Sequence, residues 1–290
     1  MPELPEVQAL TAGLAARMAG KRVDVCQLTS FSALKTVDPP LEELVGRTVA
    51  GVDRRGKFVC IDLGSRWLVT HLALGGWVKW YDSLAKGPLR PGRSPIALRV
   101  GLDDGSGFDI TEMGHEKRLA MWVVGSPEEV GPLAALGVDP LTPAFTVDRL
   151  GALLSGTSAT LKTALTTQSL IAGVGNAYSD EALHRAGMSP YKLAGNLGGP
   201  EVARLHEAVV GVLTEAVGRS SSLGIAELKG DKKRALQVHG RTGEPCPVCG
   251  DTIRQVSFAT RSLQYCPTCQ TGGKPLADRR LSRLLSLIHI

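Results

Sequence analysis

Apolar residues near the start of the chain recur at the spacing of a helix. They are Val7, Leu10, Leu14 and Met18, three or four positions apart, and Gly20 ends the pattern. Pro5 suits the first turn of such a helix, where its missing N–H costs no hydrogen bond. The pattern predicts a helix that holds the first residues of the chain on a rigid support.

From about residue 22 to residue 125 the pattern changes to the alternation of half-buried strands. Segments 57–63 and 67–72 alternate most clearly, and glycines and an Asp104-Gly105 pair mark the turns between strands. Many short strands of this kind predict an antiparallel β-sandwich or a flattened barrel.

The rest of the chain alternates between helical and irregular stretches. Four prolines and little periodicity predict a linker, the helical pattern that follows ends near Val217, and residues 219–236 are polar and loop-like. Near the end, leucines at helical spacing predict a short helix between Leu276 and Ile290.

The predicted fold class is therefore α+β with several domains. We expect an N-terminal catalytic domain of helix and β-sandwich (1–130), a linker (131–147), a helical domain (148–235), a cysteine ribbon (236–272) and a C-terminal extension (273–290).

Composition adds little to this picture. The chain has 290 residues, 33 Lys and Arg against 28 Asp and Glu, and a net charge of +5. The excess favours a nucleic-acid partner only weakly, although basic residues crowd the last quarter of the chain. The absence of a signal segment and of a long apolar run predicts a cytoplasmic protein without membrane contact.

Four of the six cysteines form two close pairs. Cys246 and Cys249 are followed, after sixteen residues, by Cys266 and Cys269. This spacing is typical of a tetrahedral zinc site on a β-ribbon. Because four thiolates leave no open position, we expect one structural Zn²⁺ per chain that takes no part in catalysis.

The first residues also carry candidate chemistry. Removal of Met1 would make Pro2 a secondary amine with a reference pKa of about 8, able to attack a carbonyl carbon. Glu3 beside it offers a carboxyl group for proton transfer. An ordinary chain start is the alternative.

Four stretches resemble the family of formamidopyrimidine-DNA glycosylase and endonuclease VIII, in the family's order. They are the opening MPELPEV, the segment 54–58, the segments 161–163 and 171–178, and the run from Leu236 into the four cysteines. The resemblance implies a helix-two-turn-helix domain in the helical region. It also implies a bifunctional DNA glycosylase and AP lyase of base excision repair, a monomer acting on damaged double-stranded DNA at the bacterial nucleoid.

The resemblance also implies roles for single residues. In it Pro2 is the nucleophile, Glu3 the proton donor, and Glu6 steadies the hydrogen bonds around them. The implied contacts to DNA are made by Lys57, Lys162, Asn176 and Arg261 to phosphates, by His71 and Leu74 on one loop, and by Lys117, Arg118 and Leu119 on another. Among these, Leu74 and Leu119 would be apolar wedges that fill the gap left by a flipped base.

Two departures from the family leave the substrate open. In the family one loop has the sequence Asp-Pro-Arg-Arg-Phe-Gly, whereas the corresponding residues 114–120 of this chain contain no Phe. The segment 219–236 is shorter than the family segment that covers the flipped base. The substrate of such an enzyme could therefore be oxidised purines, or another lesion class such as oxidised pyrimidines. The alternative to an enzyme is a non-catalytic zinc-ribbon protein that senses DNA damage. His239 is expected to be structural, since no partner for it is evident.

Overall fold

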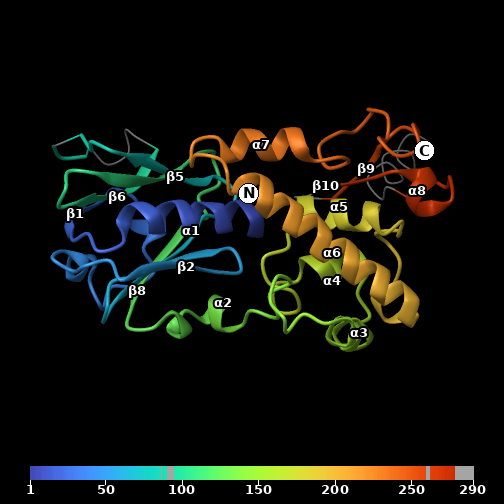
Figure 1. The fold of residues 1–290 in the computed structure, drawn as a ribbon, viewed down its shortest axis with the longest axis horizontal. Helices are drawn as coiled ribbons and strands as arrows, with labels where there is room; N and C mark the ends of the chain where they lie inside the picture. The colour runs from blue at the N-terminus through green and yellow to red at the C-terminus, as the bar shows by residue number, and fades with distance from the viewer. Residues whose placement is uncertain (86, 90–94, 259–261, 278–290) are drawn as a thin grey trace, which may run out of the picture. The chain divides into compact units, whose positions relative to one another are not determined.

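The computed structural model describes residues 1–85, 87–89, 95–258 and 262–277. The chain divides into two compact units, and both are discontinuous in sequence (Figure 1). The first unit comprises Met1–Leu136 with Val217–Asp231, and the second comprises Gly137–Ala216 with Lys232–Ile290. The late segment 217–231 thus belongs to the unit that also contains the N-terminus.

The first unit is a helix with two antiparallel sheets. Helix α1 (Leu4–Met18) lies where the apolar spacing predicts it. In the described part of the chain, one sheet has the order β1–β6–β7–β5 and the other the order β2–β3–β4–β8. The strands of the first sheet, in spatial order, are β1 (Val23–Leu28), β6 (Ile96–Leu102), β7 (Gly107–Glu112) and β5 (Gly76–Tyr81). The other four are β2 (Gly51–Arg55), β3 (Phe58–Asp62), β4 (Trp67–His71) and β8 (Ala120–Val124). The predicted β-sandwich is confirmed.

Alternation along the strands divides the apolar side chains between two cores. Val59 and Ile61 of β3 join the main core, which also contains the apolar stripe of α1 and residues of both sheets. Phe58 and Cys60 of the same strand point to the opposite face and pack with Leu133 of the short helix α2 (Gly131–Ala134). The sheet of β3 is therefore buried on both faces, as its nearly continuous apolar run requires.

Strand register places three connections at one end of the sandwich. Phe58 pairs with His71, and His71 pairs with Ala120, so the β2–β3 turn, the end of β4 and the start of β8 share one edge. In the other sheet Gly76 pairs with Glu112. The loops 72–75 and 113–119 therefore both cross between the sheets at the end that carries the β2–β3 turn.

The segment after Val217 differs from the expected polar loop. Helix α7 (Leu228–Ala235) occupies its second half, and Ile225 and Leu228 are buried in the main core of the first unit. The prediction was wrong here because two apolar residues anchor the segment, and their partners lie more than 100 positions away in the chain, where periodicity cannot reveal them.

The second unit contains the helical region and the ribbon. Its helices are α3 (Val147–Ser155), α4 (Leu161–Thr166), α5 (Asn176–Arg185), α6 (Gly199–Ser220) and α8 (Pro267–Thr271). Helix α6 continues past Ala216 into the segment assigned to the first unit. The ribbon consists of β9 (Arg254–Ser257) and β10 (Ser262–Tyr265), paired antiparallel. The helix expected between Leu276 and Ile290 falls mostly outside the described residues.

Candidate active site and zinc ribbon

The N-terminus of α1 gathers two buried carboxyl groups beside Pro2. Glu3 is the N-cap residue, and its N–H donates to Glu6 Oε2 at 2.8 Å, which closes a capping box. Glu3 and Glu6 are each 2% exposed, and Pro2 is also buried. The positive end of the helix dipole favours negative charge at this position. The local sequence thus fixes Glu3 next to Pro2, and Glu6 acts by holding the backbone of Glu3.

The β2–β3 turn carries Lys57 and is joined to α1. The guanidinium of Arg54 donates to Gln8 Oε1 of α1 at 2.7 Å and to the Gly56 carbonyl at 3.1 Å. Gly56 has φ +55°, the left-handed conformation that a tight turn requires. Lys57 is 6% exposed, so its ammonium group is held within the protein surface rather than on a solvated turn.

His71 lies beside this turn at the end of β4. Its ring centroid is 4.9 Å from that of Phe58. Burial, and to a lesser extent the positive charge of Lys57, together lower the pKa of His71 to about 4. The imidazole is therefore neutral at physiological pH and adds no charge next to Lys57.

The two loops that cross between the sheets present different side chains from those expected. Leu74 is 57% exposed, as a wedge requires, whereas Leu119 is 2% exposed and belongs to the main core. The expected wedge role of Leu119 stays a prediction, and it would require the side chain to leave the core to reach DNA. Lys117 Nζ donates to the Glu112 carbonyl at 2.9 Å, and the exposed Arg118 pairs with Glu116 at 2.8 Å.

In the second unit, a glycine turn precedes helix α5. Gly173 has φ +86°, and its N–H donates to Gln168 Oε1 at 3.0 Å. Gln168 Nε2 in turn donates to the Val174 carbonyl at 2.7 Å. Gly175 is the N-cap of α5, so the turn leads directly to the positive end of a ten-residue helix. The positive end of a helix favours negative charge, so this position suits an anion.

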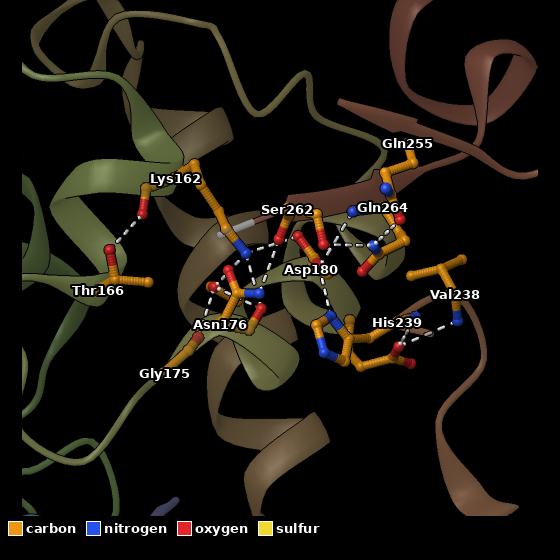
Figure 2. Close-up of polar contacts among 12 residues, drawn as sticks. Lys162, Thr166, Gly175, Asn176, Asp180, Val238, His239, Gln255, Ser262 and Gln264 are labelled. Carbon is orange, nitrogen blue, oxygen red and sulfur yellow. Dashed lines mark hydrogen bonds and ion pairs between the residues drawn. The ribbon is translucent and has the colours of Figure 1, made fainter. Parts of the chain in front are cut away.

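Lys162 points into the protein and not toward solvent. Its Nζ donates to the Asn176 carbonyl at 2.7 Å, to Ser179 Oγ at 2.8 Å and to Asp180 Oδ1 at 2.6 Å (Figure 2). Its side chain is 12% exposed. Three N–H donors with three internal acceptors leave none for a phosphate. In this structure Lys162 fixes α4 on α5, and its expected contact with DNA stays a prediction.

Asp180 connects the helical region to the ribbon. Besides Lys162, its carboxylate accepts from His239 Nδ1 at 2.7 Å and from the Gln264 N–H at 3.2 Å (Figure 2). His239 thus has a partner, contrary to expectation. Asn176 adds a further bond, since its Nδ2 donates to the Ser262 carbonyl of β10 at 2.7 Å.

Glu181 and His184 extend the same face of α5. The Glu181 carboxylate accepts the N–H groups of Gln237, Val238 and His239 at 2.9 to 3.0 Å. His184 Nε2 lies 3.2 Å from Cys246 Sγ. No local pattern identifies these residues, because a carboxylate or imidazole on a helix can be paired only once its distant partners are known.

The four paired cysteines converge. Their sulfur atoms all lie within 4.8 Å of one another, with Cys249 and Cys266 at 3.4 Å and Cys246 and Cys269 at 3.9 Å. Four sulfurs around a zinc ion at 2.3 Å stand about 3.8 Å apart in a tetrahedron, so the cluster fits the metal. Arg261, expected at the tip of this ribbon, lies outside the described residues.

None of the described helices has the length and apolar character needed to cross a membrane.

Comparison with known proteins matches three family models along the chain. The formamidopyrimidine-DNA glycosylase N-terminal domain matches residues 1–113, and the H2TH domain of the same glycosylase matches residues 136–225. The zinc finger found in FPG and IleRS matches residues 243–272.

Relatives match over nearly the whole chain. The formamidopyrimidine-DNA glycosylase of Symbiobacterium thermophilum is 37% identical, covering 97% of this chain and 93% of the relative. The structure of Lactococcus lactis Fpg in complex with DNA containing an abasic site superposes with a TM-score of 0.82 at 26% identity, covering 93% of this chain and 99% of that one. A MutM structure in complex with DNA containing carbocyclic 8-oxo-G gives a TM-score of 0.80 at 26% identity, covering 93% and 100%. With this identity sustained along the chain, and with the N-terminal, H2TH and zinc-finger parts all matched in order, the protein belongs to the formamidopyrimidine-DNA glycosylase family.

Proposed function

We propose that the protein is a bifunctional DNA glycosylase and AP lyase that removes oxidised purines during base excision repair. The observation that carries this proposal is the N-terminus of α1, where Pro2 and the buried Glu3 are held together by the capping box. The family relationship supplies the substrate class, since solved relatives hold DNA with an abasic site or with 8-oxo-G.

The chemistry begins with the free amine of Pro2. Its lone pair attacks C1′ of the damaged nucleotide, the bond from C1′ to the base breaks, and the displaced base takes up the proton that the Pro2 nitrogen loses. As the sugar ring opens, the nitrogen lone pair forms the C=N bond and Glu3 donates a proton to the ring oxygen. The product is an iminium ion that links enzyme and sugar. Loss of a proton from C2′ then permits elimination of the 3′ phosphate, and a second elimination releases the 5′ phosphate.

Other residues hold the DNA while this happens. In the first unit Lys57 supports a phosphate, and in the second unit the positive end of the α5 dipole attracts another. Asn176 and Arg261 keep their expected roles at phosphates, whereas Lys162 acts from within the protein. Zinc, when bound by the four cysteines, holds the ribbon in shape and supplies no chemistry to the reaction.

The loop 113–119 leaves a second substrate class to test. With Leu119 in the core, Lys117 and Arg118 are the remaining candidates to face the base opposite the lesion. A panel of duplexes, each with one oxidised purine or one oxidised pyrimidine, distinguishes the two classes by initial excision rates. We further propose that the protein acts as a monomer, in the cytoplasm at the bacterial nucleoid.

Trapping with borohydride tests the nucleophile. Incubation with abasic-site DNA and borohydride should reduce the iminium ion to a stable amine, visible as a covalent protein–DNA species on a denaturing gel. Peptide mapping should place the link on Pro2. Lys57 is the competing amine, but a lysine has a reference pKa of about 10.4 and is mostly protonated at neutral pH.

The matched control is the same chain with an uncleaved N-terminal tag, which blocks the amine and leaves every side chain in place. Equal trapping by the tagged and the free protein would exclude Pro2. Glu3→Gln should lose excision of an oxidised base more than cleavage of an abasic site, because an abasic site has no base to expel.

A further inference from the structure

Two loops at the end of the sandwich that carries Lys57 each expose a large apolar side chain. Leu74 is 57% exposed on the β4–β5 loop, and Met113 is 61% exposed on the β7–β8 loop. Since their loops are hydrogen-bonded to each other, the two residues offer apolar surface at one end of the sandwich. Leu119, the wedge that the family resemblance implies on the same loop, is buried.

The backbone locks these two loops together. The Met113 N–H donates to the Gly75 carbonyl at 3.0 Å. A Cβ atom on Gly75 would lie 1.9 Å from the Met113 carbonyl oxygen, so only glycine permits this approach. Residue 73 is an alanine with φ +50°, a conformation that costs free energy in a residue with a side chain. Leu74 and Met113 therefore stand on one strained and close-packed junction.

A buried carboxylate holds the rest of the Met113 loop. Glu112 is 4% exposed, and its Oε1 accepts the N–H groups of Arg118 and Leu119 at 2.6 and 2.7 Å. These bonds close the loop over residues 113–117 and keep Leu119 inside. Met113 directly follows Glu112 and lies outside the core. The hydrogen bonds of Glu112 and the close approach of Gly75 hold its backbone in place.

We propose that Met113 acts with Leu74 as an apolar wedge that fills the space left in the duplex when the damaged nucleotide flips out. This inference rests on the proposed function. Methionine and leucine are among the side chains that enter between base steps, and the gap must be filled to prevent restacking. The occupant is thus the interrupted base stack of duplex DNA, and Met113 is a specificity residue for DNA that contains such a gap.

The test compares binding to two duplexes that differ only in the gap. One carries a tetrahydrofuran abasic analogue, which the lyase chemistry cannot cleave, and the other is intact. Because the wedge contacts only the DNA with the gap, Met113→Ala should weaken binding to the tetrahydrofuran duplex by about tenfold, or about 1.4 kcal/mol, and leave the intact duplex nearly unchanged. Leu74→Ala should act in the same direction, and Met113→Leu should restore most of the preference.

Val37→Ala is the matched control, because Val37 is an apolar residue of the same unit, 93% exposed, and away from both loops in the chain. A 2-aminopurine base placed next to the gap gives a second readout, since its fluorescence reports local stacking. Met113→Ala should change this signal in the complex, whereas Val37→Ala should not.

Two results would overturn the inference. Met113→Ala could keep the full preference for the tetrahydrofuran duplex, or it could weaken binding to both duplexes equally, as a general contact would. Neither result bears on the proposed function, which fails instead if the unmodified protein neither cleaves abasic-site DNA nor traps on it.

Discussion

Replacing Asp180 by Asn should loosen the connection between the helical region and the ribbon. Asp180 is 1% exposed, and its carboxylate is paired with Lys162, whose side chain is only 12% exposed. Removing one charge of a buried pair typically costs about 3–5 kcal/mol. Because Asn keeps an oxygen for Lys162, we expect about 3 kcal/mol, at the lower end of that range. The N–H₂ group of the new Asn side chain would also face the Gln264 N–H. The Gln264 N–H would then have no acceptor.

The distribution of tryptophans allows each unit to be followed separately. All four, Trp67, Trp77, Trp80 and Trp122, lie in the first unit, so their fluorescence reports its unfolding in urea. Release of zinc to a chromogenic chelator reports the ribbon of the second unit. With an m value of about 2 kcal/mol/M, a loss of about 3 kcal/mol moves the midpoint of zinc release down by about 1.5 M urea.

The control is Glu215→Gln, which removes one partner of the solvated Arg185–Glu215 pair on the same unit. An exposed pair contributes about 0–1 kcal/mol, so the midpoint should barely move. The tryptophan transition should stay in place for both variants. If Asp180→Asn and Glu215→Gln shift zinc release by the same small amount, the buried network does not hold the ribbon.

Three further outcomes follow from other parts of the structure. Arg99→Met should destabilise the first unit by about 3–5 kcal/mol in urea unfolding followed by tryptophan fluorescence, because the carboxylate of Asp109, 0% exposed in the fold, would lose the two hydrogen bonds that it accepts from Arg99; a loss below 1 kcal/mol would refute this. His71 should make stability depend on pH: its pKa is lowered in the fold from 6.5 to about 4, so the unfolded chain takes up the proton first. The contribution of His71 to the free energy of unfolding is complete above about pH 6.5 and is lost as pH falls to about 4. The loss is at most about 3 kcal/mol. Over the same pH window the stability of His71→Leu, measured by urea unfolding, should vary less. Cys249→Ser should abolish stoichiometric zinc, measured by metal analysis, and weaken DNA binding while the tryptophan transition stays unchanged; full zinc content in this variant would contradict the four-thiolate site.

Local patterns predicted the parts of the fold that depend on neighbours in the chain. The stripe of Val7 and Leu10 predicted α1, alternation predicted the strands, and the cysteine spacing predicted a cluster whose sulfurs do converge. In each case the structure depends on a spacing of two to four residues, which can be read directly from the sequence.

The contacts that local patterns could not predict depend on partners far away in the chain. Asp180 receives hydrogen bonds from Lys162, His239 and Gln264, and none of them is close to it in sequence. Lys162 is indistinguishable from a solvated lysine until Asp180 is placed next to it. Leu119 likewise reads as an apolar residue of an exposed loop until Glu112 is seen to hold its backbone inward.

The discontinuity of the first unit has a consequence for the order of events during synthesis. Helix α1 is among the first parts of the chain to leave the ribosome, but its neighbour Ile225 is made near the end: a Cβ on Gly13 would lie 3.3 Å from Ile225 Cγ1. At about 5–20 residues per second, the roughly 200 intervening residues take on the order of 10–40 s. During that time the main core lacks Ile225 and Leu228. The first unit therefore reaches its full stability only near the end of synthesis, although the strands and helix that make up most of it are made first.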